Sequence, residues 1–379
     1  MDPVPVYTID LSRPPAQRYV EVVCDFREKI PHLTELFREV VTASGLPPKP
    51  TTRVARLLLR RLYSHEQTEE IRGISDASGV DMYLLVCLNT LLDLFMGCTS
   101  GGARAKIGGA GNGRQSRMLH FRTLDWDMDP LREVVVQLNF VNDPQGPVIA
   151  RSITYVGFVG ALTAVRPGLS LSLNFRPYHN DSHSRASNLL FHYHRVLVLL
   201  GRRPSISSTL RSILLTPDPS DGHGRLDTIS SIQRRIPDGD KTMVMEKDRV
   251  TACTSTSTSF IVIANHDTSS DNDPAAAHGI NNTKLAIAGM NELVEDSQHR
   301  IHCIKSKWQE AEKRFRRRRK QANNEEVNTE LSVTESQLIN WVEAWPITNE
   351  CTHYATIMDP LVGDFVYLQR YNQPQIVSE

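Results

Sequence analysis

A cysteine, an arginine and an aspartate are spaced so that they could form one reactive centre. Cys98 opens the run Cys-Thr-Ser at 98–100, and Arg122 and Asp125 follow in the next β-rich segment. A thiol attacks a carbonyl as the thiolate, so it needs a nearby base or cation. A free α-amine, with an ordinary pKa of about 7.7–8, supplies such a base if the chain is cut just before the cysteine. The bond between Gly97 and Cys98 is the one at which such a cut would have to fall.

Each of these residues also has a plain structural interpretation. Taken alone, Cys98 is better explained as a small buried apolar side chain. Arg122 and Asp125, taken alone, are typical of an ion pair at the end of a strand. Residues i and i+3 of a strand face opposite sides, so directing both side chains at one site requires a bulge or turn after Arg122.

The pattern of the sequence changes at Cys98. Before it, periodicity predicts a strand at 7–11 and helices at 16–43, 52–64 and 84–95. After it, a glycine-rich loop is predicted at 101–113, and then a mainly antiparallel sheet. Its predicted strands are 118–123, 134–142, 148–156, 160–165, 169–174, 242–246 and 259–265, with a closing hairpin at 352–359 and 364–369. Helices are predicted at 190–213 and 335–342, with a basic helix or linker at 309–322. This order predicts an α+β fold of the layered αββα type.

Composition limits the classes of partner. The chain has 379 residues and a formal net charge of zero, which gives no general attraction to nucleic acid. The most apolar stretch, 153–165, is shorter than the roughly 20 residues that span a bilayer. The N-terminus lacks the pattern of a secretory signal, which favours a cytoplasmic location. The six cysteines and the histidines lack metal-ligand spacing, so we expect no metal and no cofactor.

A basic run at 313–320 is the one strongly charged segment. Such a run can bind nucleic acid or anionic lipid. Acidic residues flank it at Glu310, Glu312, Glu325 and Glu326, so a solvated helix face or linker explains it better. We expect no nucleic-acid partner.

Several motifs in order resemble the acid ceramidase and N-acylethanolamine-hydrolysing acid amidase family of N-terminal-nucleophile hydrolases. Residues 4–19 resemble the start of those proteins, and 98–100 resembles their self-cleaving junction. Residues 122–125 match their Arg-Asn-Met-Asp segment, 157–168 resembles their glycine-rich strand pair, and 264–267 is similar to their Thr-Asn-Tyr-Asp. The resemblance covers about residues 4–303, with a weaker tail to about 369.

The resemblance implies a role for five residues. Cys98 would be the nucleophile, and its freed amine the base. Asp125 would hold that amine, and Arg122 would lie beside the thiol. Asn265 would donate its side-chain N–H to the tetrahedral oxyanion, and Arg300 resembles a later arginine of the family.

The resemblance also implies a fold, an activity and partners. The fold would be the N-terminal-nucleophile αββα sandwich, with a helical, alpha-subunit-like segment at 1–97 and a beta-subunit-like catalytic region at 98–379. The two self-cleaved fragments would stay associated. The protein would hydrolyse ceramide or an N-acylethanolamine to a fatty acid and an amine, with transient contact to a membrane or lipid surface. The family's relatives favour a lysosomal or vacuolar location.

Two other functions stay open at this point. A penicillin or conjugated bile-acid amidase also places a cysteine before Arg-x-x-Asp, although the start of this chain favours the lipid amidases. An inactive lipid-binding member of the fold is the second alternative. It is suggested by 216–240, which is polar and turn-rich where the family has a buried apolar strand.

Overall fold

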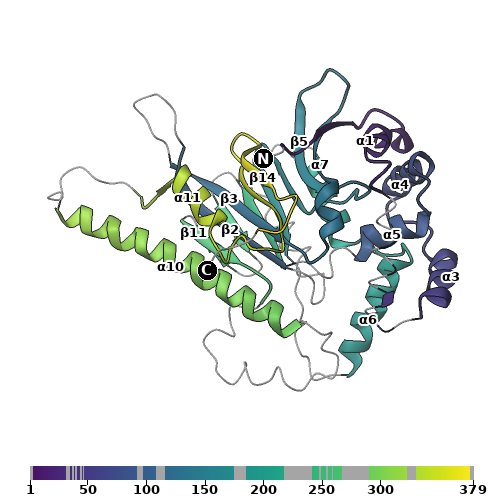
Figure 1. Ribbon diagram of the computed structural model, residues 1–379. Coiled ribbons are helices and arrows are strands. Elements are labelled where there is room, and N and C mark those ends of the chain that lie inside the picture. The colour runs from purple at the N-terminus through teal and green to yellow at the C-terminus, as the bar shows by residue number, and fades with distance from the viewer. Residues whose placement is uncertain are drawn as a thin grey trace.

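The computed structural model describes most of the chain. The described residues are 3–30, 35, 38, 41–42, 45, 47–91, 97–107, 116–174, 185–216, 241–246, 249–252, 255–257, 259–266, 290–321 and 330–375. Within them, two β-sheets face each other, and helices cover the outer side of each sheet (Figure 1). The α+β class and the layered αββα arrangement predicted from the sequence are confirmed.

The first sheet has eight strands in the described residues. Their order is β1-β4-β5-β6-β7-β8-β9-β10. In that order the strands are β1 (Val6–Asp10), β4 (Val135–Val141), β5 (Val148–Tyr155), β6 (Thr163–Arg166), β7 (Leu169–Asn174), β8 (Lys241–Glu246), β9 (Arg249–Ala252) and β10 (Ser255–Ser257). Strand β1 pairs in parallel with β4, and the other neighbours are antiparallel. The segment before Cys98 therefore supplies an edge strand of this sheet.

The second sheet carries the residues expected to do chemistry. Its order is β11-β2-β3-β13-β14, and the short β12 (Val333–Thr334) pairs with β2. The other strands are β11 (Phe260–Ile263), β2 (Gly97–Lys106), β3 (Ser116–Asp125), β13 (Thr352–Asp359) and β14 (Asp364–Arg370). The inner face of β3, with His120 and Arg122, points at the first sheet, because both ring nitrogens of His120 contact serine hydroxyls of β7.

Helices of residues 20–91 and of residues 185–215 lie on the outer side of the first sheet. They are α1 (Val20–Asp25), α3 (Pro48–Leu58), α4 (His65–Ser78), α5 (Met82–Leu91), α6 (Arg185–Leu199) and α7 (Ile206–Leu215), with 3₁₀ turns at Pro15–Gln17 and Asp129–Val134. Helix α4 begins at the N-cap Ser64, ends at the left-handed Gly79, and buries Ile71 and Ile74. A Cβ at Gly73 would lie 1.8 Å from the carbonyl oxygen of Ala16, so only glycine permits this close packing.

Two helices cover the outer side of the second sheet. They are α10 (Met290–Gln321) and α11 (Glu335–Glu343), and α11 begins with a capping box between Thr334 and Gln337. Ile301, Ile304 and Trp308 of α10 form an apolar layer with β2, β3 and β11. Beyond this layer, the basic end of α10 extends away from the sheet (Figure 1).

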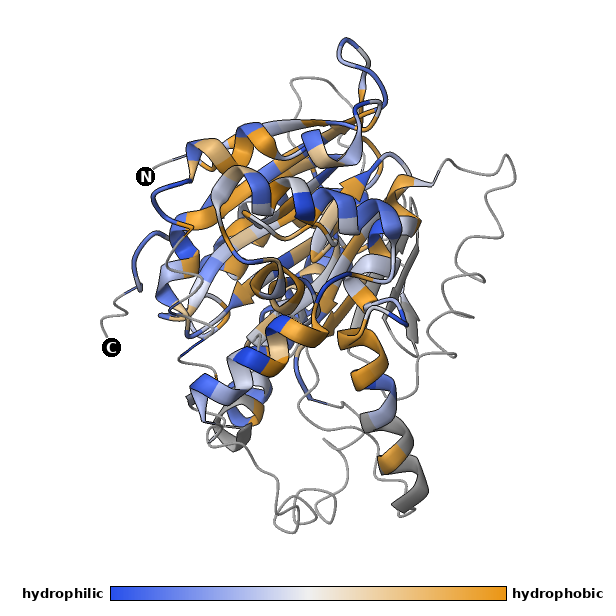
Figure 2. Cartoon of the chain, turned by 90° about the vertical axis from the view of Figure 1, so that its right-hand side faces the viewer, coloured by the Kyte–Doolittle hydropathy of each residue, from blue (hydrophilic) through white to orange (hydrophobic). Residues whose placement is uncertain are grey.

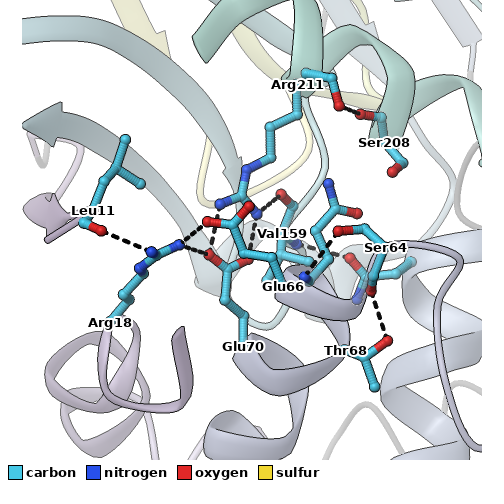
Figure 3. Close-up of polar contacts among 12 residues, drawn as sticks. Leu11, Arg18, Ser64, Glu66, Thr68, Glu70, Val159, Ser208 and Arg211 are labelled. Carbon is cyan, nitrogen blue, oxygen red and sulfur yellow. Dashed lines mark hydrogen bonds and ion pairs between the residues drawn. The ribbon is translucent and has the colours of Figure 1, made fainter. Parts of the chain in front are cut away.

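A buried ion cluster joins the N-terminal segment to α7. Glu70 of α4 is fully buried and binds Arg211 of α7 through both carboxylate oxygens. Arg211 also donates to the carbonyl oxygen of Val159 at 2.8 Å. Arg18 donates to Glu70 at 2.9 Å and also contacts Glu66 (Figure 3). These residues, Arg18, Glu66, Glu70 and Arg211, are called the Glu70 cluster below.

The structure corrects several predicted element bounds. The helix predicted at 16–43 is a 3₁₀ turn and the short α1, and its later part lies largely outside the described residues. The predicted loop at 101–113 is strand as far as Lys106, because Gly101 packs against the ring of Phe121 and only a residue without Cβ fits there. The helix predicted at 190–213 is two helices, divided at Gly201 with φ +61°. The stretch 217–240 lies outside the described residues.

Candidate active site

Cys98 lies at the start of β2 and is fully buried. Its register partner on β3 is Leu124, and both side chains belong to the apolar core between the sheets. The preceding residue, Gly97, is the register partner of Asp125. The bond expected to be cut therefore lies at the start of β2, beside Asp125.

The Arg122 guanidinium holds the thiol from the inner face. Its Nη2 lies 3.1 Å from Cys98 Sγ, and its Nη1 donates to Asn174 Oδ1 at 2.7 Å. Ser100 completes the group, because its hydroxyl donates to Asn174 Oδ1 at 2.6 Å and lies 3.2 Å from Arg122 Nη1. A fixed cation at this distance favours the thiolate over the thiol.

Asn265 contacts the backbone nitrogen of the same cysteine. Strand β11 pairs with β2 up to Ile263, which lies opposite Ser100, so Asn265 falls beside Cys98. There its Oδ1 accepts the backbone N–H of Cys98 at 2.8 Å, in place of a ladder bond. Arg300 of α10 donates to the same Oδ1 at 2.9 Å. The backbone N–H of Asn265 donates in turn to the hydroxyl of Ser297, also on α10, at 2.7 Å.

Asp125 approaches from the opposite face of β3. One carboxylate oxygen accepts from the hydroxyl of Thr352 at 2.7 Å, and the other lies 3.7 Å from Arg300 Nη1. That second oxygen is buried and accepts no hydrogen bond among the described residues. Burial raises the pKa of Asp125, although Arg300 and the Thr352 hydroxyl act in the opposite direction. The site thus holds a buried carboxylate oxygen near the backbone of 97–98.

The strand geometry differs from the expectation that a bulge must follow Arg122. The pairing of β2 with β3 is regular from Gly97 to Lys106, and Arg122 and Asp125 do face opposite sides. The two side chains approach different atoms. Arg122 contacts the thiol of Cys98, and Asp125 lies beside the backbone of Gly97 and Cys98. All five residues proposed from the sequence, including Asn265 and Arg300, are therefore brought together. Their catalytic roles remain predictions.

Three supporting residues were not identified from the sequence. Thr352 holds Asp125, and Ser297 holds the backbone of Asn265. Arg132 is buried and donates to the carbonyl oxygens of Glu350 and Thr352, so it fixes the segment that carries the Thr352 hydroxyl. A lone Thr, Ser or Arg gives no pattern by itself. The pairing of β3 with β13 brings Thr352 to Asp125, and the packing of α10 near the end of β11 brings Ser297 to Asn265.

The described residues contain no group of three or more His, Cys, Asp or Glu that could hold a metal ion. The reactive groups around Cys98 are a thiol, a guanidinium, an amide and a carboxylate.

The two facing sheets, with helices on their outer sides, form an αββα sandwich, and Cys98 lies at the start of a strand of the second sheet. Comparison with known proteins gives a more particular relationship. Residues 2–63 match the family model NAAA-beta, described as the beta subunit of N-acylethanolamine-hydrolyzing acid amidase. The resemblance to the N-acylethanolamine-hydrolysing acid amidase and acid ceramidase family is thereby confirmed for part of the chain.

Similar curated proteins carry the same two names. An N-acylethanolamine-hydrolyzing acid amidase of Caenorhabditis elegans is 30% identical over 45% of this chain and 47% of its own length. The acid ceramidase of Mus musculus is 29% identical over 46% of each chain. This chain thus spans about half the length of the curated relatives it matches. The solved structure of the Caenorhabditis elegans N-acylethanolamine-hydrolyzing acid amidase ortholog aligns with a TM-score of 0.43 and 20% identity, covering 70% of this chain and 94% of that one.

Proposed function

We propose that this protein is a self-processing cysteine amidohydrolase that cleaves the amide bond of a lipid amide. The observation that carries the proposal is the convergence on Cys98. A guanidinium contacts its thiol, an amide carbonyl contacts its backbone nitrogen, and a buried carboxylate with an open oxygen lies by that backbone. The names of the similar proteins support ceramide or an N-acylethanolamine as the substrate.

Self-processing would begin with attack of the Cys98 thiolate on the carbonyl carbon of Gly97. The peptide C–N bond breaks, a thioester forms, and the nitrogen of Cys98 takes up a proton to become an amine. Water then hydrolyses the thioester, which releases Gly97 as a carboxylate and restores the thiol. The amide N–H of the uncut chain donates to Asn265. The new amine gains further N–H donors, and Asp125 holds the open acceptor.

The processed enzyme would then use the same atoms on its substrate. The neutral amine takes the thiol proton, and the thiolate attacks the amide carbonyl. Asn265 Oδ1 accepts from two donors, and in this mechanism its side-chain N–H would stabilise the oxyanion. Collapse releases the amine product with the proton and leaves an acyl thioester on Cys98. Water hydrolyses this thioester to the free fatty acid.

The proposal includes contact with a lipid surface through α3 and α6. Both helices pack against α5 on the side of the molecule that Figure 2 shows. They expose large apolar side chains: Val54, Leu57 and Leu58 on α3, and Leu189, Tyr193 and Val196 on α6. Exposed arginines, among them Arg53, Arg60 and Arg61, adjoin them. Apolar side chains beside cations are the pattern of a helix that binds the interface of an anionic bilayer. No helix among the described residues is long and apolar enough to cross a membrane.

Two experiments test these proposals. Purified protein incubated with N-acylethanolamine or ceramide should release free fatty acid, detected by mass spectrometry, and Cys98→Ala should release none. Release that persists in Cys98→Ala contradicts the assigned nucleophile. For the surface, sedimentation with phosphatidylserine vesicles should be lost in Leu57→Ser/Leu58→Ser. It should be retained in Leu361→Ser/Val362→Ser, which changes exposed apolar residues at the β13–β14 turn.

A further inference from the structure

Strand β13 contains one extra residue beside the proposed active site. Thr352 lies opposite Asp125 and Tyr354 lies opposite Leu124, so His353 has no register partner on β3. This is a β-bulge, a feature that redirects a side chain and is frequent next to active sites. The backbone oxygen of His353 accepts from the N–H of Tyr371 at 2.9 Å.

The bulge places the imidazole of His353 between two buried partners. Its Nε2 lies 2.9 Å from the carbonyl oxygen of Trp126, and its Nδ1 lies 2.9 Å from the hydroxyl of Tyr155 on β5. A carbonyl oxygen only accepts, so Nε2 carries the proton and donates. In the neutral ring Nδ1 then accepts, so Tyr155 is the donor.

The charge state of His353 is fixed as well. Burial, helped by the nearby Arg132, lowers the pKa of His353 to about 3. The ring therefore stays neutral across the physiological range, and the direction of both hydrogen bonds does not change with pH.

The three residues joined by these hydrogen bonds also pack their aromatic rings against one another. Trp126, Tyr155 and His353 are almost fully buried. The centroids of Trp126 and Tyr155 lie 5.9 Å apart, those of Tyr155 and His353 lie 5.8 Å apart, and both pairs meet edge to face. Edge-to-face contacts are a preferred geometry of aromatic pairs, so they constrain the orientation of these rings. The hydrogen bond from Tyr155 also crosses from the first sheet to the second.

The contacts of Trp126, Tyr155 and His353 reach the residues on either side of Asp125. Trp126 directly follows Asp125, and its backbone N–H donates to Cys351 at 2.7 Å while its carbonyl accepts from His353. Thr352, which directly precedes His353, donates to the carboxylate itself. A shift of the His353 ring would therefore displace both the backbone after Asp125 and the hydroxyl on its carboxylate.

We propose that Tyr155 and His353 are positioning residues that hold Asp125 where it can bind the amine of Cys98. The inference rests on the proposed function, because it is the self-processed amine that Asp125 would bind. Neither residue touches the substrate in this account, so both should affect the rate of the chemical steps and not substrate binding.

The test is Tyr155→Phe, which removes one hydroxyl and keeps the ring. Its processing before Cys98 should slow, and kcat should fall about 10-fold, because small misplacements of a reacting group are costly. KM should stay within about twofold of wild type, because binding is not changed. A purely structural role predicts a lower melting temperature with kcat per processed molecule unchanged, and that outcome overturns the inference.

Two comparisons complete the experiment. Tyr367→Phe removes a tyrosine hydroxyl on β14 that donates to Glu343 of α11, and it should leave kcat unchanged. His353→Gln keeps a side chain that can donate to Trp126, so it should retain more kcat than His353→Leu. Equal kcat in these two variants contradicts the proposal.

The outcomes also separate this inference from the proposed function. A wild-type protein that is neither cut nor active overturns the proposed function together with this inference. An active wild type with unchanged kcat in Tyr155→Phe overturns this inference alone.

Discussion

The side-chain carbonyl of Asn265 lies 2.8 Å from the backbone nitrogen of Cys98, although 167 positions separate the two residues in the sequence. Arg300 contacts the same oxygen at 2.9 Å. Because both neighbours are donors, the amide oxygen must face them and the amide nitrogen must point elsewhere. In the proposed mechanism, this side chain would bind the amine of Cys98 with its oxygen and an oxyanion with its nitrogen.

Asn265→Asp should separate these two functions. The variant keeps an oxygen for Cys98 but loses the N–H donor, so kcat should fall about 100- to 1000-fold in a fatty-acid release assay. Asn139→Asp, a change of the same type on β4 away from Cys98, should have little effect. An unchanged kcat in Asn265→Asp would exclude Asn265 as the oxyanion donor.

Arg122→Lys should show that the guanidinium, and not charge alone, is needed beside the thiol. One Lys nitrogen cannot contact both Cys98 and Asn174 as Arg122 does. We expect kcat/KM to fall about 100-fold, which corresponds to a loss of about 2.7 kcal/mol of transition-state stabilisation. Arg117→Lys, on the same strand and paired with Asp359, is the matched control. Near-normal turnover in Arg122→Lys would mean that a positive charge alone suffices.

Two buried histidines should make the fold less stable in acid. Burial, with Arg122 as a smaller cause, lowers the pKa of His120 to about 3, and burial with Arg132 does the same for His353. The unfolded chain takes up these protons near pH 6.5, so stability is full above that pH and is lost as the pH falls toward 3. Each histidine should remove about 2 kcal/mol of unfolding free energy between pH 7 and pH 5.

Chemical denaturation at these two pH values checks the prediction. His120→Gln should lose about half of the pH dependence attributed to the pair, because glutamine can still contact the serines of β7 but does not titrate. A stability that is flat from pH 7 to pH 5 in the wild type would mean that the buried rings are not held neutral.

The Glu70 cluster should keep the two proposed fragments together. Glu70→Gln leaves Arg211 buried without its carboxylate, and losing one partner of a buried pair costs about 3–5 kcal/mol. After processing, size-exclusion chromatography should show loss of the 1–97 fragment from the variant. Glu69→Gln removes an exposed pair with Arg72 and should cost less than about 1 kcal/mol. Stable association of the fragments in Glu70→Gln would mean that the pairing of β1 with β4, and not the Glu70 cluster, holds them together.

The sequence predicted what depends on local pattern and missed what depends on long-range contact. Strand β7 matched its predicted bounds, because its alternation is visible in one short window. Strand β2 was mistaken for a loop after Ser100, because its glycines are explained only by Phe121 on the neighbouring strand. The residues of the site were found through motifs. The hydroxyl of Thr352, 227 positions from Asp125, has no local signal.

The bulge at His353 shows the same limit more sharply. A one-residue offset between β3 and β13 arises from the pairing of two strands, and no periodicity in either strand records it. Its consequence, a hydrogen bond from Tyr155 in the other sheet, joins three segments that are distant in the sequence.

The most direct test of the account is the intact mass of the purified protein after incubation at acidic and at neutral pH, with Cys98→Ala treated in parallel. We predict two fragments that meet between Gly97 and Cys98 in the wild type, and a single uncut chain in the variant. A wild-type chain that stays whole under both conditions, or a variant that is cut at the same bond, would contradict it.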